Sequence, residues 1–438
     1  MFHRSYDYSG MTDNEYLETG RGQYGRHLWR FKKGFSYYYF DLEPKSKKAM
    51  TKNQKVEFQR RLLDQIKKHS KRSYRDKIIA EFVINPSSNN PPHIHTAMKN
   101  ILDLFGKPLH GSGIKRKGLV YNDDKQIIYL ISRYNLDNIE AGITAFFYPF
   151  RSFLDDLKLA NDILNENKLD SSFLNDIGEV DDKIDFNDNF DKYIRWVEDK
   201  ETNIRLLGED LYNLKVKFNK MKIQEEFFNS CRLKIKDIYY LYYSVGIITD
   251  RKFTILRLEQ LEELFRDQLN SISKWITNSP IKIKLPRIPI TEGETRTFKD
   301  IVRERLRTYK DKYKILEPLY TPIALEVIYK PPIFSNGFYK DLDNIMRLII
   351  PIFNETFNPP PSYLSVYDFE ERDMTQELPK SVKYSVMKYE IFEIPRSEDD
   401  TEDGFISMGI TGGLSCFNSM WDRINKIIRE WERQDYFE

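Results

Sequence analysis

The chain has 438 residues, which exceeds the ~100–200 residues of a typical single domain, so we expect more than one structural unit. Hydrophobic residues make up 40% and aromatic residues 14% of the chain, and these shares exclude an intrinsically disordered composition. The formal net charge of +2 excludes a uniformly basic or acidic protein. Any preference for charged partners must therefore come from how charge is distributed along the chain.

Cysteine usage and hydropathy indicate the cellular setting. The chain has 2 cysteines, Cys231 and Cys416, and their separation predicts neither a disulfide framework nor a structural zinc site. The first residues lack the apolar core of a signal peptide, and no apolar run approaches the ~18 residues that a membrane helix needs. We therefore expect a cytoplasmic protein that does not associate with membranes.

The predicted elements repeat one order twice. After an N-terminal extension at 1–34, a first unit at 35–151 reads strand, helix, strand, helix, strand, strand. Its last four elements lie in KIIAEFVINPSSNNPP, PHIHTAMKNILDLFGKPL, GLVYNDDKQIIYLISRY and AGITAFFYPF. After a helical spacer at 152–278, a second unit at 279–396 follows the same order, with its later elements in TPIALEVIYKPP, KDLDNIMRLIIPIFNETF, NPPPSYLSVYDFEERD and KYSVMKYEIFEIP. Residues 397–438 are predicted to form an acidic linker and a C-terminal helix. The fold class predicted from this order is α+β, with two related units in one chain.

Charge is segregated between two segments. Lys47–Lys77 is strongly basic and Asp170–Asp191 is strongly acidic. Each segment has an ordinary explanation as a solvated face, but a basic face beside a carboxylate metal site suits substrates that carry phosphate. The basic segment supplies the candidate DNA-binding residues Arg60, Arg61, Lys67 and Lys68.

The stretch YKDLDNIMR, at 339–347, places two carboxylates on alternate residues directly before an apolar helix. Alternate residues of an extended segment project to the same side, so Asp341 and Asp343 can face one point in space. Two hard oxygen ligands at close range suit Mg²⁺ or Mn²⁺, either of which could activate water against a phosphodiester. The alternative is an ordinary helix cap, in which the carboxylates accept hydrogen bonds from exposed backbone N–H groups.

A strand that ends in prolines, followed by D-L-D-N and a basic residue three positions later, resembles the RusA-like crossover-junction endodeoxyribonucleases. That family cuts four-way DNA junctions as dimers, uses Mg²⁺, and pairs its D-x-D-N motif with a lysine and with a D-D-x-Q motif on the next strand. Asp341, Asp343 and Asn344 match the first motif, and Arg347 stands at the lysine position. In the first unit, Asp123, Asp124 and Gln126 match the second motif, and Lys99 stands at the lysine position.

Each unit has lost one motif of the pair. In the second unit, Pro360 and Pro361 stand where the D-D pair belongs, and in the first unit His93 and His95 replace the two aspartates of D-x-D-N. Three interpretations remain open. Both sites could be inactive, which would leave a scaffold or interaction protein; the retained aspartates of the two units could complete one shared site; or His93, His95 and Asp124 could bind a transition metal.

The resemblance implies a pseudo-dimer within one chain that binds branched or structured DNA, such as four-way junctions, and that cleaves it as a Mg²⁺- or Mn²⁺-dependent endonuclease. The implied catalytic residues are Asp341, Asp343 and Asp124, the candidate metal ligands add Asp123, His93 and His95, and Lys99 and Arg347 are expected near the DNA. The alternative is an inactive RusA-like scaffold that binds protein partners through the helical spacer.

Overall fold

The computed structural model of the chain describes residues 10–87, 91–135, 140–170, 186–229, 282–332, 341–357, 386–394, 404–412 and 419–434, and a few single residues between them. Its centre is one mixed sheet of 8 strands in the order β1-β4-β2-β3-β7-β6-β8-β5. The strands are β1 (Ser36–Phe40), β2 (Ile78–Asn85), β3 (Ile127–Tyr134), β4 (Gly142–Pro149), β5 (Lys282–Leu285), β6 (Ile323–Lys330), β7 (Val386–Glu393) and β8 (Phe405–Gly412). With its helices, this sheet confirms the predicted α+β class.

The two halves of the sheet have the same topology. In one half, β4 lies between β1 and β2 and is antiparallel to both, and β2 pairs in parallel with β3. In the other half, β8 lies between β5 and β6 in the same way, and β6 pairs in parallel with β7. Both parallel pairs also have an irregularity at the same place, between Ile78 and Ile79 in β2 and between Ile323 and Ala324 in β6. We refer to the elements from β1 to α5 as unit 1 and those from β5 to α15 as unit 2.

The units join through their third strands. β3 pairs with β7 in antiparallel register, with Leu130 opposite Ile391 and Ser132 opposite Tyr389. An antiparallel pair of equivalent strands relates the two halves as a two-fold axis would, because each strand presents the same edge to the other. The sheet is therefore continuous across the units, and elements of unit 1 lie directly beside their counterparts in unit 2.

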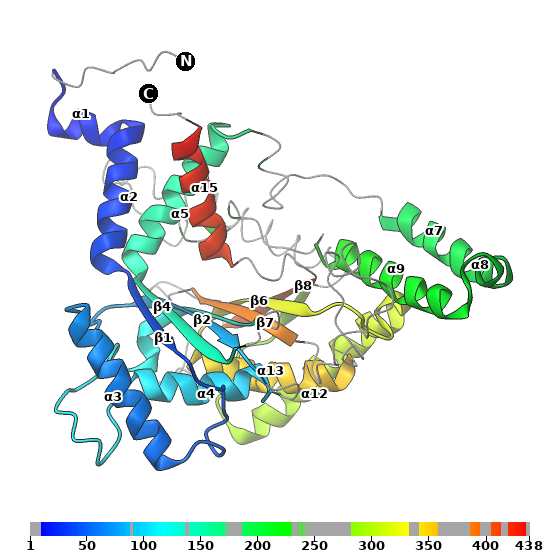
Figure 1. Ribbon diagram of the computed structural model, residues 1–438, viewed down its shortest axis with the longest axis horizontal. Helices are drawn as coiled ribbons and strands as arrows, with labels where there is room; N and C mark the ends of the chain where they lie inside the picture. Colours follow the sequence, from blue (N-terminus) through cyan, green and yellow to red (C-terminus); the bar gives the residue numbers. More distant parts are fainter. Residues whose placement is uncertain are drawn as a thin grey trace.

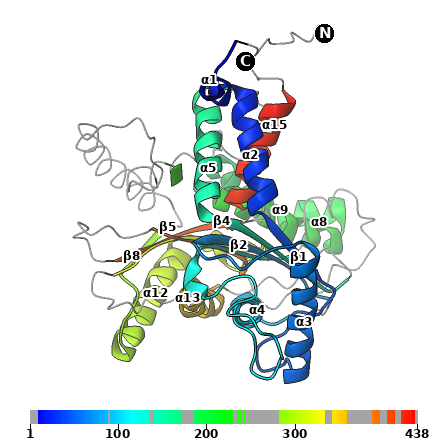
Figure 2. The same cartoon turned by 90° about the vertical axis from the view of Figure 1, so that its left-hand side faces the viewer.

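Helices cover both faces of the sheet, as Figures 1 and 2 show. One face packs against α3 (Lys52–Lys68), α4 (Ile94–Phe105), α12 (Glu292–Lys312) and α13 (Leu342–Thr356). The other face packs against α5 (Phe150–Asn165) and α15 (Met420–Arg433), with α2 (Gly20–Gly34) beside them after the short α1 (Asp13–Glu18). Buried apolar side chains form one large cluster on each face, so burial on both sides holds the sheet.

Helices also account for the described part of the spacer. It contains α7 (Phe186–Glu198), α8 (Lys200–Leu207) and α9 (Glu209–Asn229). Outside the spacer, the short 3₁₀ turn η1 (Asp124–Gln126) precedes β3, and a second one, η2 (Lys314–Leu316), follows α12. Among the described helices, none combines the length and apolar character that crossing a lipid bilayer requires.

The end of unit 2 differs from the prediction. The segment KYSVMKYEIFEIP was expected to be the last strand, but it forms β7, the counterpart of β3. The last strand is β8, which lies beyond residue 396 in the segment expected to be a linker, and the following helix α15 packs against α5. Glycines in the segment FISMGITG weaken its strand signal, but pairing with both β5 and β6 holds it in the sheet. The stretch at 358–373, most of the acidic run and the end of the spacer lie outside the described residues.

A buried ion pair lies near the junction of the units. Lys388 Nζ is 2.5 Å from Glu390 Oε1, and both side chains are 2% exposed. Tyr129 of β3 donates a hydrogen bond to Glu390 Oε2 at 2.5 Å. Burial alone would raise the pKa of Glu390, but the charges of Lys388 and Arg423 outweigh that effect and lower it.

Replacing Lys388 with methionine should lower the free energy of unfolding by about 3 kcal/mol, because it leaves the buried Glu390 carboxylate without its ammonium partner. Urea unfolding at neutral pH measures this change. The double variant Lys388→Met, Glu390→Gln should recover most of the stability, since a neutral amide can still accept the hydrogen bond from Tyr129. A double variant as unstable as the single one would show that packing of the Lys388 side chain, rather than its charge, stabilises the junction.

Candidate metal centre

The D-x-D-N motif lies at the start of α13. Asp341 is the N-cap residue, yet its side chain makes no capping hydrogen bond, and Asp343 follows in the first turn of the helix. Asn344 Nδ2 instead donates to Asp341 Oδ2 at 3.2 Å, while Arg347 Nη1 donates to Asn344 Oδ1 at 3.2 Å. The amide therefore orients the Asp341 carboxylate, and an ordinary helix cap does not explain this pair of aspartates.

Asp343 is the most deeply buried carboxylate of the motif. Its side chain is 1% exposed, and neither of its oxygens has a hydrogen-bond partner among the described residues. The Lys99 ammonium, 3.4 Å from Asp343 Oδ2, compensates part of this charge. A buried ionised carboxylate without further partners remains costly unless additional positive charge compensates it, so Asp343 favours a bound cation at this position.

Asp123 and Asp124 lie just before β3 and have different surroundings. Asp123 is exposed and caps η1, where its side chain accepts a hydrogen bond from the backbone N–H of Lys125 at 3.1 Å. The Gln126 side chain in turn accepts from the backbone N–H of Asp123 at 3.0 Å. This capping box turns the Asp124 side chain toward α4 and α13, so that Asp124 reaches the motif of the other unit.

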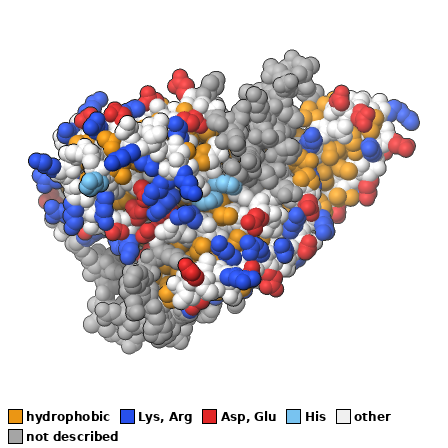
Figure 3. All heavy atoms as spheres, turned by 90° about the horizontal axis from the view of Figure 1, so that it is seen from below, with side chains coloured by type: hydrophobic (Ala, Val, Ile, Leu, Met, Phe, Trp, Pro, Cys, Tyr) orange, Lys and Arg blue, Asp and Glu red, His pale blue; other side chains and the backbone are white. Residues whose placement is uncertain are grey.

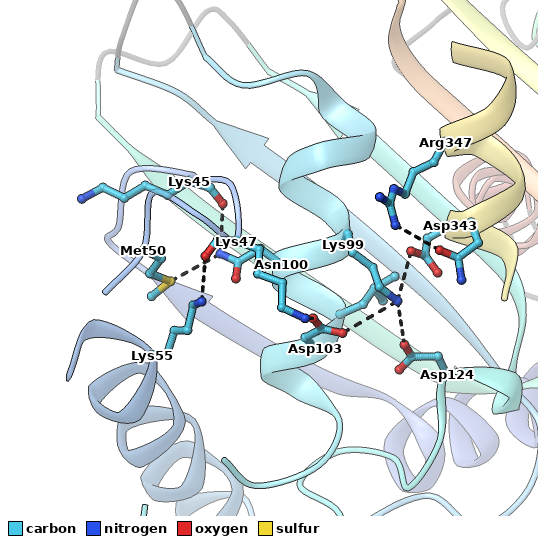
Figure 4. A network of polar contacts seen from close by, with 12 residues as sticks. Lys45, Lys47, Met50, Lys55, Lys99, Asn100, Asp103, Asp124, Asp343 and Arg347 are labelled. Atoms are coloured by element: carbon cyan, nitrogen blue, oxygen red, sulfur yellow. Dashed lines mark hydrogen bonds and ion pairs between the residues drawn. The ribbon is translucent and has the colours of Figure 1, made fainter. Parts of the chain in front are cut away.

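The structure brings Asp124 of unit 1 together with Asp341 and Asp343 of unit 2. One carboxylate oxygen from each residue lies within 4.8 Å of the others. Lys99, on α4, lies between them, with its Nζ 3.4 Å from Asp343 Oδ2 and 3.6 Å from Asp124 Oδ2 (Figure 4). The acid triad, as we call Asp124, Asp341 and Asp343, is therefore a composite of both units.

Mutual repulsion and burial perturb the ionisation of the triad. Burial, with the charges of Asp343 and Asp341, raises the pKa of Asp124 to about 6 against the opposing charge of Lys99. Burial also raises the pKa of Asp341 and of Asp343. Burial alone would lower the pKa of Lys99, but four surrounding carboxylates outweigh that effect and raise it. Lys99 is thus held as an ammonium ion, and the triad carries more negative charge than one ammonium neutralises.

The donor set fits a hard divalent cation. Three carboxylates and one ammonium leave two negative charges uncompensated, and a divalent ion would balance them. All three ligands are oxygens, which Mg²⁺ and Mn²⁺ prefer over nitrogen or sulfur. The triad can therefore hold one such ion.

Asp123→Ala is the natural control for the triad. Because Asp123 caps η1 and does not belong to the triad, its loss should lower the free energy of unfolding by about 1 kcal/mol, the usual cost of a lost cap. Titration calorimetry should show Mn²⁺ affinity within about threefold of the unmutated chain, since a change of that size is under 1 kcal/mol. Loss of binding in this variant would place Asp123 among the ligands.

The histidine site predicted as one alternative is not formed. Among the described residues, the group of side chains that could hold a metal contains no histidine. His93 Nδ1 lies 3.4 Å from Asn354 Nδ2, near the end of α13, whereas Lys99 meets Asp343 near the start of α13. α4 and α13 therefore run in opposite directions, and this separates His93 and His95 from Asp124. Burial, together with His93 and Arg347, lowers the pKa of His95 to about 3, which keeps this imidazole neutral.

Other predicted binding residues are spread over unit 1 and α13. Arg60 and Lys67 line a hollow beside α3, Arg61 pairs with Asp41, and Lys68 is exposed. Arg347 is also exposed. Figure 3 shows Lys and Arg side chains gathered over α3 and α4 on the left of the face seen from below.

Sequence reasoning missed the residues that support Lys99. Asp103, one helical turn after Lys99, lies 3.8 Å from its ammonium and 2.6 Å from Lys47 Nζ. The spacing of Lys99 and Asp103 on a predicted helix was a signal for this pair. Lys47 and Lys55 also line the hollow that contains Asp124 and Asp341, and only the fold brings them there.

Comparison with family models, curated proteins and solved structures found no match for this chain.

Proposed function

We propose that this chain is a divalent-metal-dependent endonuclease that acts on branched or otherwise structured DNA through a single composite site. The observation that carries the proposal is the convergence of Asp124, Asp341 and Asp343, contributed by both units, within 4.8 Å. Carboxylate clusters of this kind are the usual way in which proteins present Mg²⁺ or Mn²⁺ to a phosphodiester.

The resemblance to RusA-like junction endonucleases supports the same function. The motif that unit 2 retains and the motif that unit 1 retains are the two that this family uses together. The duplicated topology, with units joined through β3 and β7, is what a pseudo-dimer requires. Two incomplete motif sets therefore supply one complete set of carboxylates.

The surroundings of the triad suit a phosphodiester substrate. The hollow that contains Asp124 and Asp341 is also lined by Lys47, Lys55 and Lys107. Once a divalent ion balances the carboxylates of this hollow, these lysines attract a polyanion. Lys99 is placed to donate to a phosphate oxygen, where a cation stabilises charge that develops during the reaction. A bound divalent ion would supply Lewis-acid polarisation of the phosphate and a water of lowered pKa.

The test combines metal binding with cleavage. Calorimetry should show one Mn²⁺ or Mg²⁺ bound per chain, and that binding should be lost in Asp341→Asn, Asp343→Asn. Labelled four-way junctions, flaps and linear duplexes should then be incubated with the chain in either metal and in EDTA. Metal-dependent cutting of the branched substrates, lost in the same variant, is the expected result.

The outcome that contradicts the proposal is equally specific. Tight junction binding without metal-dependent cutting of any substrate would leave a DNA-binding module. Failure to bind any of the substrates would favour the scaffold alternative, in which the duplicated units hold protein partners.

A further inference from the structure

A path of three neighbouring hollows, each of which shares a lining residue with the next, begins at the acid triad. The hollow containing Asp124 and Asp341 shares Asn122 with a second hollow, between the loop before β2 and the loop before β3. That second hollow shares Arg116 with a third, which lies beside α3. A ligand that follows this path would run from the triad across unit 1 alone.

Cations line the two outer hollows. They come from α3, from the loop at 70–76 and from the loop at 111–118, and we refer to the six that matter here as the unit 1 track: Arg60, Lys67, Arg72, Arg75, Arg116 and Lys117. Asp64 and Asp76 are the only acidic residues that line these two hollows in the described part of the chain. A surface with this excess of positive charge fits a polyanion with regularly spaced phosphates.

The chemistry of the lining distinguishes duplex from single-stranded DNA. Proteins that bind single strands stack bases on aromatic side chains along a cationic groove. No phenylalanine, tyrosine or tryptophan of the described residues lines any of the three hollows. Contacts from Arg and Lys without aromatic platforms suit the backbone of a duplex, whose bases are already stacked.

In the described part of unit 2, one segment of the equivalent surface is covered. There the loop at 313–322, between α12 and β6, is the counterpart of the loop at 69–77 in unit 1. Gln224 of α9 donates to the carbonyl oxygens of Ile315 at 2.6 Å and Pro318 at 2.9 Å, and accepts from the Tyr320 N–H at 2.7 Å. Gln224 itself is fully buried in this contact. The spacer helix α9 thus packs on the unit 2 loop, whereas Arg72, Arg75 and Asp76 of the unit 1 loop are exposed to solvent.

The helices that precede the two loops, α3 in unit 1 and α12 in unit 2, also differ in where they carry positive charge. The Thr51 and Thr291 capping boxes align α3 with α12, and in this alignment Arg60 corresponds to Asp300, whereas Lys67 corresponds to Arg307. The pseudo-two-fold relation therefore repeats only part of the cationic lining, and the Arg60 position is cationic in unit 1 alone. The counterpart of the 111–118 loop lies outside the described residues.

From this asymmetry we propose that the unit 1 track binds one duplex DNA arm beside the acid triad, while α9 prevents an equivalent arm from docking on unit 2. The inference rests on the proposed function for the identity of the polyanion, and it adds that the chain engages its branched substrate from one side. One arm held on one side of a single site leads to a nick in one strand, rather than to paired cuts.

The test compares two charge-reversal variants of the full chain that carry the same change in net charge. The track variant is Arg72→Glu, Arg75→Glu, Arg116→Glu, Lys117→Glu. The matched control, on α12 of unit 2, is Arg296→Glu, Lys299→Glu, Arg303→Glu, Arg307→Glu. Both carry Asp341→Asn so that no cutting disturbs binding, and thermal melting followed by circular dichroism confirms that both fold.

Fluorescence anisotropy with a labelled four-way junction gives the result. The track variant should bind at least about 100-fold more weakly, and its slope of log K against log salt should become shallower by about 3.6, because about four phosphate contacts are lost. The control variant should bind within about threefold of its parent, since it lacks direct contacts and bulk charge is screened at moderate salt. Equal weakening in both variants, or in neither, overturns the one-sided track.

Further measurements distinguish failure of this inference from failure of the proposed function. A single-stranded oligonucleotide that binds more tightly than the junction would overturn the duplex assignment. Metal-dependent cutting with both strands of a junction cleaved at equivalent positions would retain the endonuclease and reject one-sided engagement. Track-dependent binding without any cutting would do the reverse, keeping the duplex track and rejecting the nuclease.

Discussion

Asp124→Asn and Asp341→Asn should each reduce the rate of metal-dependent junction cutting by at least about 1,000-fold, and the double variant should be no slower than either single variant. The two residues come from different units, yet their carboxylates lie in one triad. Ligands that hold a single catalytic ion act as a unit, so the loss of a second one removes nothing that the first loss has not already removed. Non-additive effects across the two units are thus the signature of a shared site.

Single-turnover cleavage of a labelled four-way junction, with enzyme in excess and Mn²⁺ present, measures these rates. Asp123→Ala serves as the control, because its side chain caps η1 and lies outside the triad. Residual activity in each single variant, with further loss in the double, would instead show that each unit carries its own site. In that case the composite triad would not be the catalytic centre.

In the metal-free protein, Asp124→Asn should raise the free energy of unfolding at pH 7.5 by about 2–3 kcal/mol relative to its effect at pH 4. Burial and the neighbouring carboxylates raise the pKa of Asp124 from 3.8 to about 6. The folded state therefore keeps a proton that the unfolded state releases. The stability that this carboxyl contributes is complete below pH ~4 and is lost as the pH rises through about 6.

Urea unfolding of both proteins across this pH range, in EDTA, measures the difference. Adding Mg²⁺ or Mn²⁺ at pH 7.5 should stabilise the unmutated chain much more than the variant, because the ion binds the folded triad and not the unfolded chain. A pH-independent difference between the two proteins would mean that Asp124 ionises as it does in the unfolded chain. The triad would then lack the repulsion between carboxylates that favours a bound cation.

The sequence by itself determined the chemistry that each half of the chain can offer. The spacing of Asp341 and Asp343 indicated either a metal site or a helix cap, because alternation and a helix start are local properties of the chain, and the resemblance favoured the metal site. The repeated order of elements was also local information, carried by hydrophobic periodicity. The resemblance then indicated Asp124 and Lys99 and the role of each. All four lie in the candidate site.

Only the tertiary structure decided which of these residues meet. Asp124 and Asp343 are contributed by different units, and they converge because β3 pairs with β7 and α4 runs opposite to α13. The same arrangement separates His93 from Asp124, so the described residues do not bring the histidine alternative together, and no local pattern encodes this separation. Strand β8 was missed because its glycines resemble a linker, and pairing on both edges overrides that preference. The packing of α9 on unit 2 likewise depends on contacts between residues some 90 positions apart. Packing across such separations is determined by the folded chain as a whole and not by any one segment.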